Sequence, residues 1–212
     1  MRAVLLAVAV LALAAGCGGG DDEPEASDNG TCESVAAPDP RDPGAREAPS
    51  APLAEGTTYE LVFTTSCGSF TVTLDQELAP NTVTSLVALA RDGYFGDTVF
   101  HRVVPGFVIQ GGDPTQRGDG GPGYSTVDVP PSDASYTRGT VAMAKAPLEP
   151  RGTAGSQFFV VTEDAPQLTP DYAIVGEVTE GMEAVDRIAT LGVGDGPPSQ
   201  AVVIESAAVT EG

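Results

Sequence analysis

The feature that most restricts the fold is a pair of short segments with a two-residue period. Large apolar side chains occupy every second position of residues 59–63 and again of residues 70–74, and the segment between them contains a glycine. A period of two places these side chains on one face of an extended strand, and two such runs around a glycine-containing break are typical of a β-hairpin. The sequence therefore predicts that the folded part of the chain begins with two antiparallel strands.

A helix is predicted directly after this hairpin. Pro80 stands where the first turn of a helix tolerates proline, and Gly93 is suited to a helix end. The apolar residues between them recur at helical spacing, namely Val83, Leu86, Val87 and Ala90. A second, shorter helix is predicted over residues 181–189.

The remainder of the chain contains short β-rich runs separated by loops of Gly, Pro and Asp. These runs lie at residues 97–101, 106–110, 139–144, 157–162, 172–178 and 201–209. Because they do not alternate with helices, a parallel sheet of βαβ units is disfavoured. The expected fold is mainly β, a closed eight-stranded antiparallel β-barrel capped by two α-helices.

The N-terminus has the pattern of a secretory signal. Residues 3–15 consist only of Ala, Val and Leu, and they follow a single arginine. This run is too short to cross a bilayer as a helix, because that requires about 20 apolar residues. It fits the apolar core of a signal peptide, which is removed from the mature protein.

The residues after this run look like the cleavage site of a bacterial lipoprotein. They read Ala-Ala-Gly-Cys at 14–17, and the expected leucine lies one place early, at Leu13. We expect residues 1–16 to be a lipoprotein signal peptide and Cys17 to carry lipid that holds the protein on the membrane outside the cytoplasm. The alternative is an ordinary signal peptide with an unmodified cysteine.

A change of composition marks the start of the folded domain. Residues 18–56 are rich in Gly, Pro, Ala, Asp and Glu and contain few large apolar side chains. Such a segment buries too little surface to offset its ordering entropy. We therefore predict a lipidated cysteine and disordered tether over 17–56 and one folded domain over 57–212.

The two remaining cysteines can form a pair. Export from the cytoplasm permits disulfides, and Cys32 and Cys67 are left once Cys17 is lipidated. A bridge between them would fasten the tether to the first hairpin. Two free thiols are the alternative.

The charge of the chain argues against two classes of partner. Ten basic and thirty acidic residues give a formal net charge of −20. A chain of this charge is repelled by nucleic acid and by anionic membrane surfaces. The single histidine and the cysteine spacing exclude a Cys/His zinc site.

Five sequence blocks resemble the signature segments of the cyclophilins. The central one, residues 100–113, reads Phe-His-Arg-Val-Val-Pro-Gly-Phe-Val-Ile-Gln-Gly-Gly-Asp. The others are a glycine-rich loop and three further segments, at residues 118–124, 141–144, 155–160 and 175–182. The blocks occur in family order over about residues 58–210, whereas one block alone could arise by chance. The resemblance implies a cyclophilin-like fold and peptidyl-prolyl cis/trans isomerase activity.

The resemblance also implies roles for individual residues. Arg102 would be the catalytic donor, directed at the imide nitrogen of the substrate. The substrate-binding residues would be Phe107, Val108, Gln110, Ala144, Lys145, Gln157, Phe159, Leu168 and Tyr172. Among them, Gln110 would orient the arginine, and main-chain groups of Ala144 and Lys145 would pair with the peptide. An apolar cup would be formed by Phe107, Val108, Phe159 and Leu168.

The chemistry explains why such a site needs neither nucleophile nor metal. Rotation about an X–Pro bond meets a barrier of about 18–20 kcal/mol that arises from imide resonance, and no bond is broken. An acceleration of about 10⁴-fold requires about 5.5 kcal/mol, whereas one preorganised donor supplies about 3–4 kcal/mol. The apolar cup must therefore contribute the rest. No proton is transferred, so we expect His101 to be a hydrogen-bonded structural residue, and we expect no cofactor.

Three positions depart from the family pattern. Gln167 stands where many members have tryptophan, Tyr172 replaces a common histidine, and Lys145 replaces a common asparagine. The first change puts tight binding of the family's cyclic peptide inhibitor in doubt. The cation of Lys145 should alter the preference for residues that flank the proline.

The sequence thus predicts a monomeric isomerase that acts on proline-containing segments of unfolded or partly folded exported polypeptides. The alternative from another class is a binding or chaperone module that holds such peptides with little turnover. A structural envelope lipoprotein is a third possibility. Retention of Arg102 together with Gln110, Phe107 and Phe159 argues for the enzyme.

Overall fold

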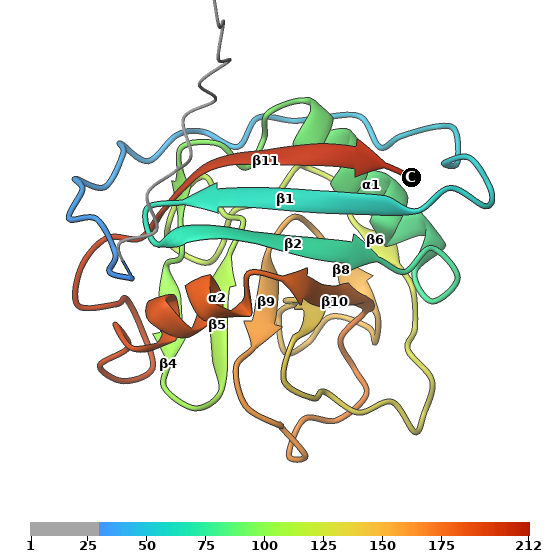
Figure 1. The fold of residues 1–212 in the computed structure, drawn as a ribbon. Coiled ribbons are helices and arrows are strands. Elements are labelled where there is room, and N and C mark those ends of the chain that lie inside the picture. Colours follow the sequence, from blue (N-terminus) through green and yellow to red (C-terminus); the bar gives the residue numbers. More distant parts are fainter. Residues whose placement is uncertain (1–29) are drawn as a thin grey trace, which may run out of the picture.

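The computed structural model describes residues 30–212, and in this range it contains eleven strands and two helices. Nine strands form one curled sheet in the order β3-β11-β1-β2-β10-β7-β9-β5-β4, and β6 and β8 form a small second sheet (Figure 1). The strands are β1 Tyr59–Thr65, β2 Gly68–Leu74, β3 Thr98–Val99, β4 Arg102–Val104, β5 Val108–Gly111, β6 Thr126–Val127, β7 Thr140–Met143, β8 Thr153–Ala154, β9 Phe158–Val161, β10 Ile174–Glu180 and β11 Val203–Glu211.

The predicted hairpin and both predicted helices are confirmed. Strands β1 and β2 pair antiparallel, and α1 (Pro80–Arg91) begins at the proline and buries the apolar stripe that the spacing indicated. The second helix, α2 (Met182–Ala189), buries Ala184, Val185 and Ile188. Helix α1 packs next to β11 and β6, whereas α2 lies against β2, β4 and β5 (Figure 1).

The sheet is curled and open, so the prediction of a closed eight-stranded barrel is wrong. Within the described residues no hydrogen-bonded ladder joins the edge strands β3 and β4. These strands are consecutive in the chain and are separated only by Phe100 and His101. The run predicted at 97–101 as one strand therefore contains only the two-residue strand β3. Its last residues link β3 to β4, so the two edges of the sheet are joined through the chain and not by a ladder. The short strands β6 and β8 were not predicted, because two residues carry no periodic signal.

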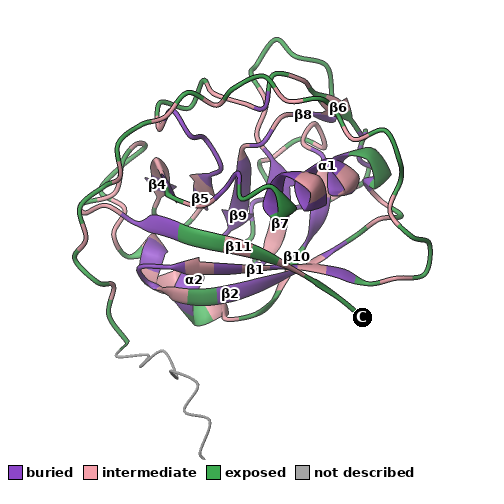
Figure 2. Cartoon of the chain, turned by 90° about the horizontal axis from the view of Figure 1, so that it is seen from above, coloured by how far each residue is buried: buried purple, intermediate pink, exposed green. Residues whose placement is uncertain are grey.

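Two apolar clusters lie on opposite faces of the strands that carry the site. Val103, Ile109, Val160 and Val141 are directly opposed across β4, β5, β9 and β7, and all belong to the main core. Their neighbours along each strand point to the other face, because side chains alternate along a strand. Figure 2 shows buried stretches in the strands and along one side of α1, and exposed stretches in the connecting segments and in part of β11.

The main core is rich in phenylalanine. Its rings contact one another at centroid distances of 5.0–6.4 Å and are Phe63, Phe70, Phe95, Phe100 and Phe158. The pair Phe63–Phe70 is stacked and the others are tilted or edge-on, arrangements that add to the energy gained from burial.

Residues 30–56, called the strap below, follow a defined path over the domain, so the prediction of a disordered tether is wrong for this part. The strap forms neither helix nor strand, but its backbone bonds to the domain: Arg41 N–H donates to Pro114 O at 3.0 Å and Arg46 N–H to Pro122 O at 2.8 Å. Figure 1 shows the strap, in blue, running across one end of the molecule. Composition alone concealed these contacts because most of them are polar.

Two arginines fasten the strap at one aromatic ring. The guanidinium of Arg46 lies 4.5 Å from the ring centroid of Tyr94, and that of Arg41 lies 5.8 Å from it. Arg41 also donates to the carbonyl oxygens of Tyr94 and Gly96, the latter at 2.9 Å. These donors satisfy carbonyl groups that follow the end of α1.

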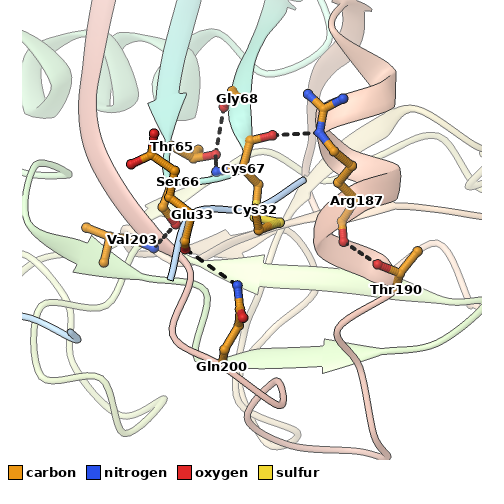
Figure 3. Close-up of a disulfide and its surroundings, with 10 residues drawn as sticks. All are labelled: Cys32, Glu33, Thr65, Ser66, Cys67, Gly68, Arg187, Thr190, Gln200 and Val203. Carbon is orange, nitrogen blue, oxygen red and sulfur yellow. Dashed lines mark hydrogen bonds between the residues drawn. A yellow bond between two sulfur atoms is a disulfide. The ribbon is translucent and has the colours of Figure 1, made fainter. Parts of the chain in front are cut away.

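The start of the strap is held by the disulfide Cys32–Cys67, which confirms the predicted pairing over the alternative of free thiols. Figure 3 shows the bridge beside the turn between β1 and β2. Glu33 N–H donates to Ser66 O at 2.7 Å, and Arg187 Nε donates to Cys67 O at 2.8 Å. The bridge thus joins the strap both to the first hairpin and, through Arg187, to α2.

The predicted signal peptide and the lipidated Cys17 lie outside the described residues. Among residues 30–212, neither helix has the length and apolar character needed to cross a membrane. In the same range no three His, Cys, Asp or Glu side chains are grouped to hold a metal ion.

Candidate active site

The site begins with a row of directly opposed residues that crosses four strands. Arg102 on β4 faces Gln110 on β5, Gln110 faces Phe159 on β9, and Phe159 faces Ala142 on β7. Opposed residues in an antiparallel pair lie on the same face with their side chains in contact range. Three predicted members of the site are therefore brought together by strand register, on the face opposite the main core.

Arg102 is bound by the amide of Gln110. Its Nη1 donates to Gln110 Oε1 at 3.2 Å, as the resemblance implied. Because a guanidinium only donates, the amide oxygen of Gln110 must face it, and the amide nitrogen must point away. That nitrogen, Nε2, donates to Gln157 Oε1 at 3.0 Å, and Gln157 Nε2 in turn donates to Gly120 O at 3.0 Å. The orientation of both glutamines is thus set by the arginine.

The glycine-rich loop that receives Gln157 is folded around a buried carboxylate. Asp113 accepts hydrogen bonds from Thr115 N–H at 2.7 Å and Thr115 Oγ1 at 2.9 Å, and from the N–H groups of Gly118 at 2.6 Å and Gly120 at 3.2 Å. A Cβ at Gly120 would lie 2.1 Å from Asp113 Oδ1, so this position requires glycine. Burial alone would raise the pKa of Asp113, but these donors together lower it below its ordinary value.

The second apolar cluster supplies the predicted cup beside Arg102. Its buried members are Val108, Tyr136, Ala142, Phe159, Val161 and Ala165, and the half-buried members packed on them are Val104, Phe107, Ala144, Leu168, Tyr172 and Ile174. All four predicted cup residues therefore meet. Val108 and Phe159 are only 2% and 5% exposed, so they form the floor, whereas the half-buried Phe107 and Leu168 stand at the rim.

The predicted rim residue Tyr172 is held edge-on to the floor. Its ring lies 5.5 Å from that of Phe159 at an interplanar angle of 85°. Tyr136, which the sequence analysis did not single out, fixes this position, because its hydroxyl donates to Tyr172 O at 2.8 Å and accepts from Tyr172 N–H at 3.1 Å. Its sequence neighbours, Ser135 and Thr137, are polar, so no pattern in the sequence marks Tyr136 as part of the site.

The predicted peptide-pairing segment is only partly as expected. Strand β7 ends at Met143, and the N–H of Ala144 donates to Gln157 O at 2.9 Å. The prediction that Ala144 offers main-chain groups to substrate is therefore wrong for its N–H, which the neighbouring strand segment already uses. Lys145 Nζ lies 5.7 Å from the ring centroid of Tyr172 and donates to Glu149 O at 3.1 Å, so its cation stands at the rim.

His101 is a half-buried residue outside this set. Both ring nitrogens are buried, and neither has a hydrogen-bond partner among residues 30–212, so the expected hydrogen-bonded imidazole is wrong in that respect. Burial lowers the pKa of His101, and the charge of Arg102 lowers it further, while Asp113 acts in the opposite direction. The side chain is thus kept neutral by its surroundings.

One contact of Arg102 was not predicted from the sequence. Asp195 accepts from Arg102 Nε at 2.5 Å and from Nη2 at 3.2 Å. The hydrogen bond and the charge of Arg102 lower the pKa of Asp195 below its ordinary value. Asp195 lies 93 residues after Arg102 in a loop without periodicity, so no sequence pattern could have joined the two.

A groove of about 970 Å³ lies elsewhere on the molecule. Its walls come from the end of the strap, from the two residues that follow it (57 and 58), and from parts of β2 and β10. None of the predicted site residues lines it, so it is separate from the site around Arg102.

Known proteins resemble this chain in both sequence and fold. The family model described as cyclophilin-type peptidyl-prolyl cis-trans isomerase/CLD matches residues 60–209. Peptidyl-prolyl cis-trans isomerase-like 1 of Aspergillus fumigatus is 36% identical over 159 residues, which cover 72% of this chain and 97% of that protein. The probable peptidyl-prolyl cis-trans isomerase B of Mycobacterium leprae is 36% identical over 184 residues, 77% of this chain and 60% of that protein.

A solved structure agrees with these relatives. The cyclophilin-type isomerase of Cryptosporidium parvum, crystallised in the presence of the dipeptide Ala-Pro, superposes with a TM-score of 0.66 at 31% identity, covering 71% of this chain and 98% of that one. The chain therefore belongs to the cyclophilin-type peptidyl-prolyl cis-trans isomerases. Its reaction is the rotation of X–Pro bonds.

Proposed function

We propose that Arg102 is the catalytic donor of this isomerase and that the enzyme acts on unfolded or partly folded polypeptides outside the cytoplasm. The observation that carries the first part is the position of Arg102. Its guanidinium donates a hydrogen bond to Gln110. Arg102 and Gln110 lie in one row across the strands with Phe159, which forms part of the floor of the apolar cup. A fixed cation thus stands beside an apolar surface of a kind that accepts a proline ring.

The reaction follows from this arrangement. In the planar imide the nitrogen lone pair is delocalised and accepts hydrogen bonds poorly, whereas in the twisted state it is localised. An N–H of Arg102 directed at that nitrogen therefore favours the twisted state over both planar ones. Phe107, Phe159 and Leu168 hold the proline ring and exclude water, which strengthens the hydrogen bond.

The second part of the proposal concerns the compartment. It is supported by the signal-like residues 3–15 and by the pair Cys32–Cys67, since disulfides persist where proteins are exported and rarely in the cytosol. Polypeptides reach that compartment unfolded, and uncatalysed X–Pro isomerisation there delays folding by tens of seconds or more. Lipid on Cys17 would hold the enzyme at the membrane where they emerge.

The test of the catalytic role is the isomerisation of short X–Pro peptides by wild type, Arg102→Lys and Arg102→Ala. We expect kcat/KM to fall by about 10²- to 10³-fold in the alanine variant, the usual effect of removing one preorganised donor. Wild-type rates in Arg102→Ala would reject the role. Tight peptide binding by a wild type that shows no turnover would favour the binding module.

The test of the anchor is the location of full-length wild type and Cys17→Ser in a bacterial host. We expect wild type in the membrane fraction and the processed serine variant in the soluble extracytoplasmic fraction. A processed Cys17→Ser protein that stays on the membrane would reject the lipid anchor.

A further inference from the structure

Arg102 has two partners in the described part of the chain, and they hold different edges of its guanidinium. Asp195 accepts from Nε at 2.5 Å and from Nη2 at 3.2 Å, and Gln110 accepts from Nη1 at 3.2 Å. An arginine carries five N–H bonds, one on Nε and two on each Nη nitrogen. Three are engaged, so one N–H on each Nη nitrogen remains for a substrate.

The loop that carries Asp195 is held by backbone hydrogen bonds. Val103, the residue after Arg102, donates its N–H to Gly196 O at 2.8 Å. The loop is closed by Ser199 N–H, which donates to Leu191 O at 2.8 Å. The carboxylate is therefore placed beside β4 by its own main chain.

Close packing adds to this fixation. A Cβ at Gly192 would lie 2.8 Å from Cδ of Pro105, so a glycine is needed for the loop to approach the end of β4. Asp195 itself stays open to solvent, with 69% of its side chain exposed. An exposed ion pair contributes little to folding stability, so the pair is not explained by the stability of the fold.

Geometry shows what Asp195 adds to Gln110. A single hydrogen bond from Nη1 leaves the guanidinium free to swing about that contact. A carboxylate that accepts from Nε and Nη2 together forms two nearly parallel bonds and fixes the plane of the group. With both partners present, the two remaining N–H bonds of Arg102 are held in a fixed orientation.

We propose that Asp195 is a positioning residue that fixes the plane of Arg102 for the isomerisation. This inference rests on the catalytic role proposed for Arg102. Asp195 touches no reacting atom in this scheme and acts only through the guanidinium.

A positioning role predicts a specific kinetic pattern. The imide nitrogen accepts a hydrogen bond well only in the twisted state, so the alignment of Arg102 matters most there. Loss of Asp195 should therefore lower kcat and leave KM nearly unchanged. A residue that merely supported the cup would weaken peptide binding and raise KM.

The experiment measures kcat and KM for Asp195→Ala, Asp195→Asn, Arg102→Ala and the double variant, with X–Pro peptides. Misalignment of a donor costs on the order of tenfold or more, so we expect kcat of Asp195→Ala to fall by about tenfold with KM within about twofold of wild type. Asparagine keeps one acceptor oxygen, so Asp195→Asn should lose less. The double variant should equal Arg102→Ala, since Asp195 has no effect once the guanidinium is gone.

Two control variants should keep wild-type kinetics. Val193→Ser changes an exposed residue of the same loop, 74% exposed. Asp186→Asn breaks another exposed ion pair with two hydrogen bonds. In this pair Arg138 donates to both carboxylate oxygens of Asp186, a residue of α2, each at 2.7 Å. They separate the effect of Asp195 from loop changes and from loss of any surface ion pair.

The possible failures can be told apart. Wild-type kcat in Asp195→Ala, with Arg102→Ala impaired, would overturn the positioning role and leave the proposed function intact. A double variant slower than Arg102→Ala by the same factor as the single Asp195 change would also overturn it, because Asp195 would then act independently of the arginine. Wild-type activity in Arg102→Ala would reject the proposed catalytic role and the positioning role together.

Discussion

Gln157 donates a hydrogen bond from Nε2 to the carbonyl oxygen of Gly120, 37 residues earlier in the chain, at 3.0 Å. This bond connects the glycine-rich loop to the face that carries Arg102, because Gln157 also accepts from Gln110, which accepts from Arg102. The loop therefore acts as a support for the arginine. Its own shape depends on Asp113, whose carboxylate takes four hydrogen bonds.

Replacing Asp113 by asparagine should therefore affect both stability and catalysis. The amide cannot accept all four donors, and a buried group left without its charged partner costs about 2 kcal/mol or more. We expect a lower midpoint in urea unfolding and a lower kcat, because Gly120 shifts and releases Gln157. Asp133→Asn, an exposed carboxylate, is the matched control and should change neither quantity. Unaltered stability in Asp113→Asn would contradict the supporting role of the carboxylate.

Removing the disulfide should destabilise the domain without changing its sheet. The bridge closes a segment of 35 residues, and in the chain-entropy model a loop of this size contributes about 3–4 kcal/mol. We expect Cys32→Ser/Cys67→Ser to unfold at lower denaturant concentration than wild type, and a reductant to lower the stability of wild type to the same level. The reductant should not affect the double serine variant. If the oxidised wild type and the variant unfold together, the bridge contributes nothing.

The strap offers a separate test at Arg41. Its guanidinium donates to the carbonyl oxygens of Tyr94 and Gly96 and lies over the Tyr94 ring, so Arg41→Ala should release the middle of the strap. We expect faster proteolytic cleavage within residues 33–50, while the disulfide still holds the start of the segment. Arg117→Ala removes an exposed arginine that pairs with Asp119 and should leave cleavage unchanged. Equal cleavage of all three proteins would show that Arg41 does not fasten the strap.

How much of the structure can be predicted from the sequence depends on whether a feature leaves a periodic pattern in it. Periodicity located the β1–β2 hairpin and both helices, because each repeats an apolar spacing over several residues. It could not supply strand register, which is what places Arg102, Gln110 and Phe159 in one row. The family resemblance supplied that grouping, residue by residue.

Other features have no local signal at all. The sheet is open because no ladder joins β3 and β4, which Phe100 and His101 separate, and a run of β-forming residues does not reveal such a break. The order of the strap depends on a few polar contacts and one disulfide, whereas composition measures only the apolar surface that a segment can bury. The pairing of Asp195 with Arg102 depends on where a distant loop meets β4.

Lys145 should set a preference for peptide charge. It is the only lysine of the chain, and its ammonium stands at the rim beside Tyr172. Lys145→Glu should reduce kcat/KM for peptides with an acidic residue next to the proline relative to matched neutral peptides, by a few-fold for an exposed charge pair of about 1 kcal/mol or less. The ratio is measured because the net charge of −20 disfavours acidic peptides in every variant. An unchanged ratio, or the same change at high salt, would reject the electrostatic role.

His101 should make the folding stability depend on pH in a range where few other groups titrate. Burial, followed by the charge of Arg102, lowers its pKa in the folded state, and Asp113 opposes this only in part. In the unfolded chain its pKa is about 6.5, so the unfolded state binds more protons below that pH, and stability falls as the pH is lowered through about 6.5 toward the folded pKa. The carboxylates Asp113 and Asp195 have lowered pKa values, so they add no slope above about pH 5. His101 is the only histidine, which makes the assignment direct.

The measurement is urea unfolding at several pH values between about 5 and 7.5 for wild type and His101→Asn. We expect the wild type to lose stability toward the acid end, with a slope of at most about 1.4 kcal/mol per pH unit. The asparagine variant should be less stable at neutral pH, because it leaves space in a packed site, but its stability should be nearly independent of pH in this range. Parallel pH profiles for the two proteins would show that His101 is protonated equally in the folded and unfolded states, and that burial does not keep it neutral.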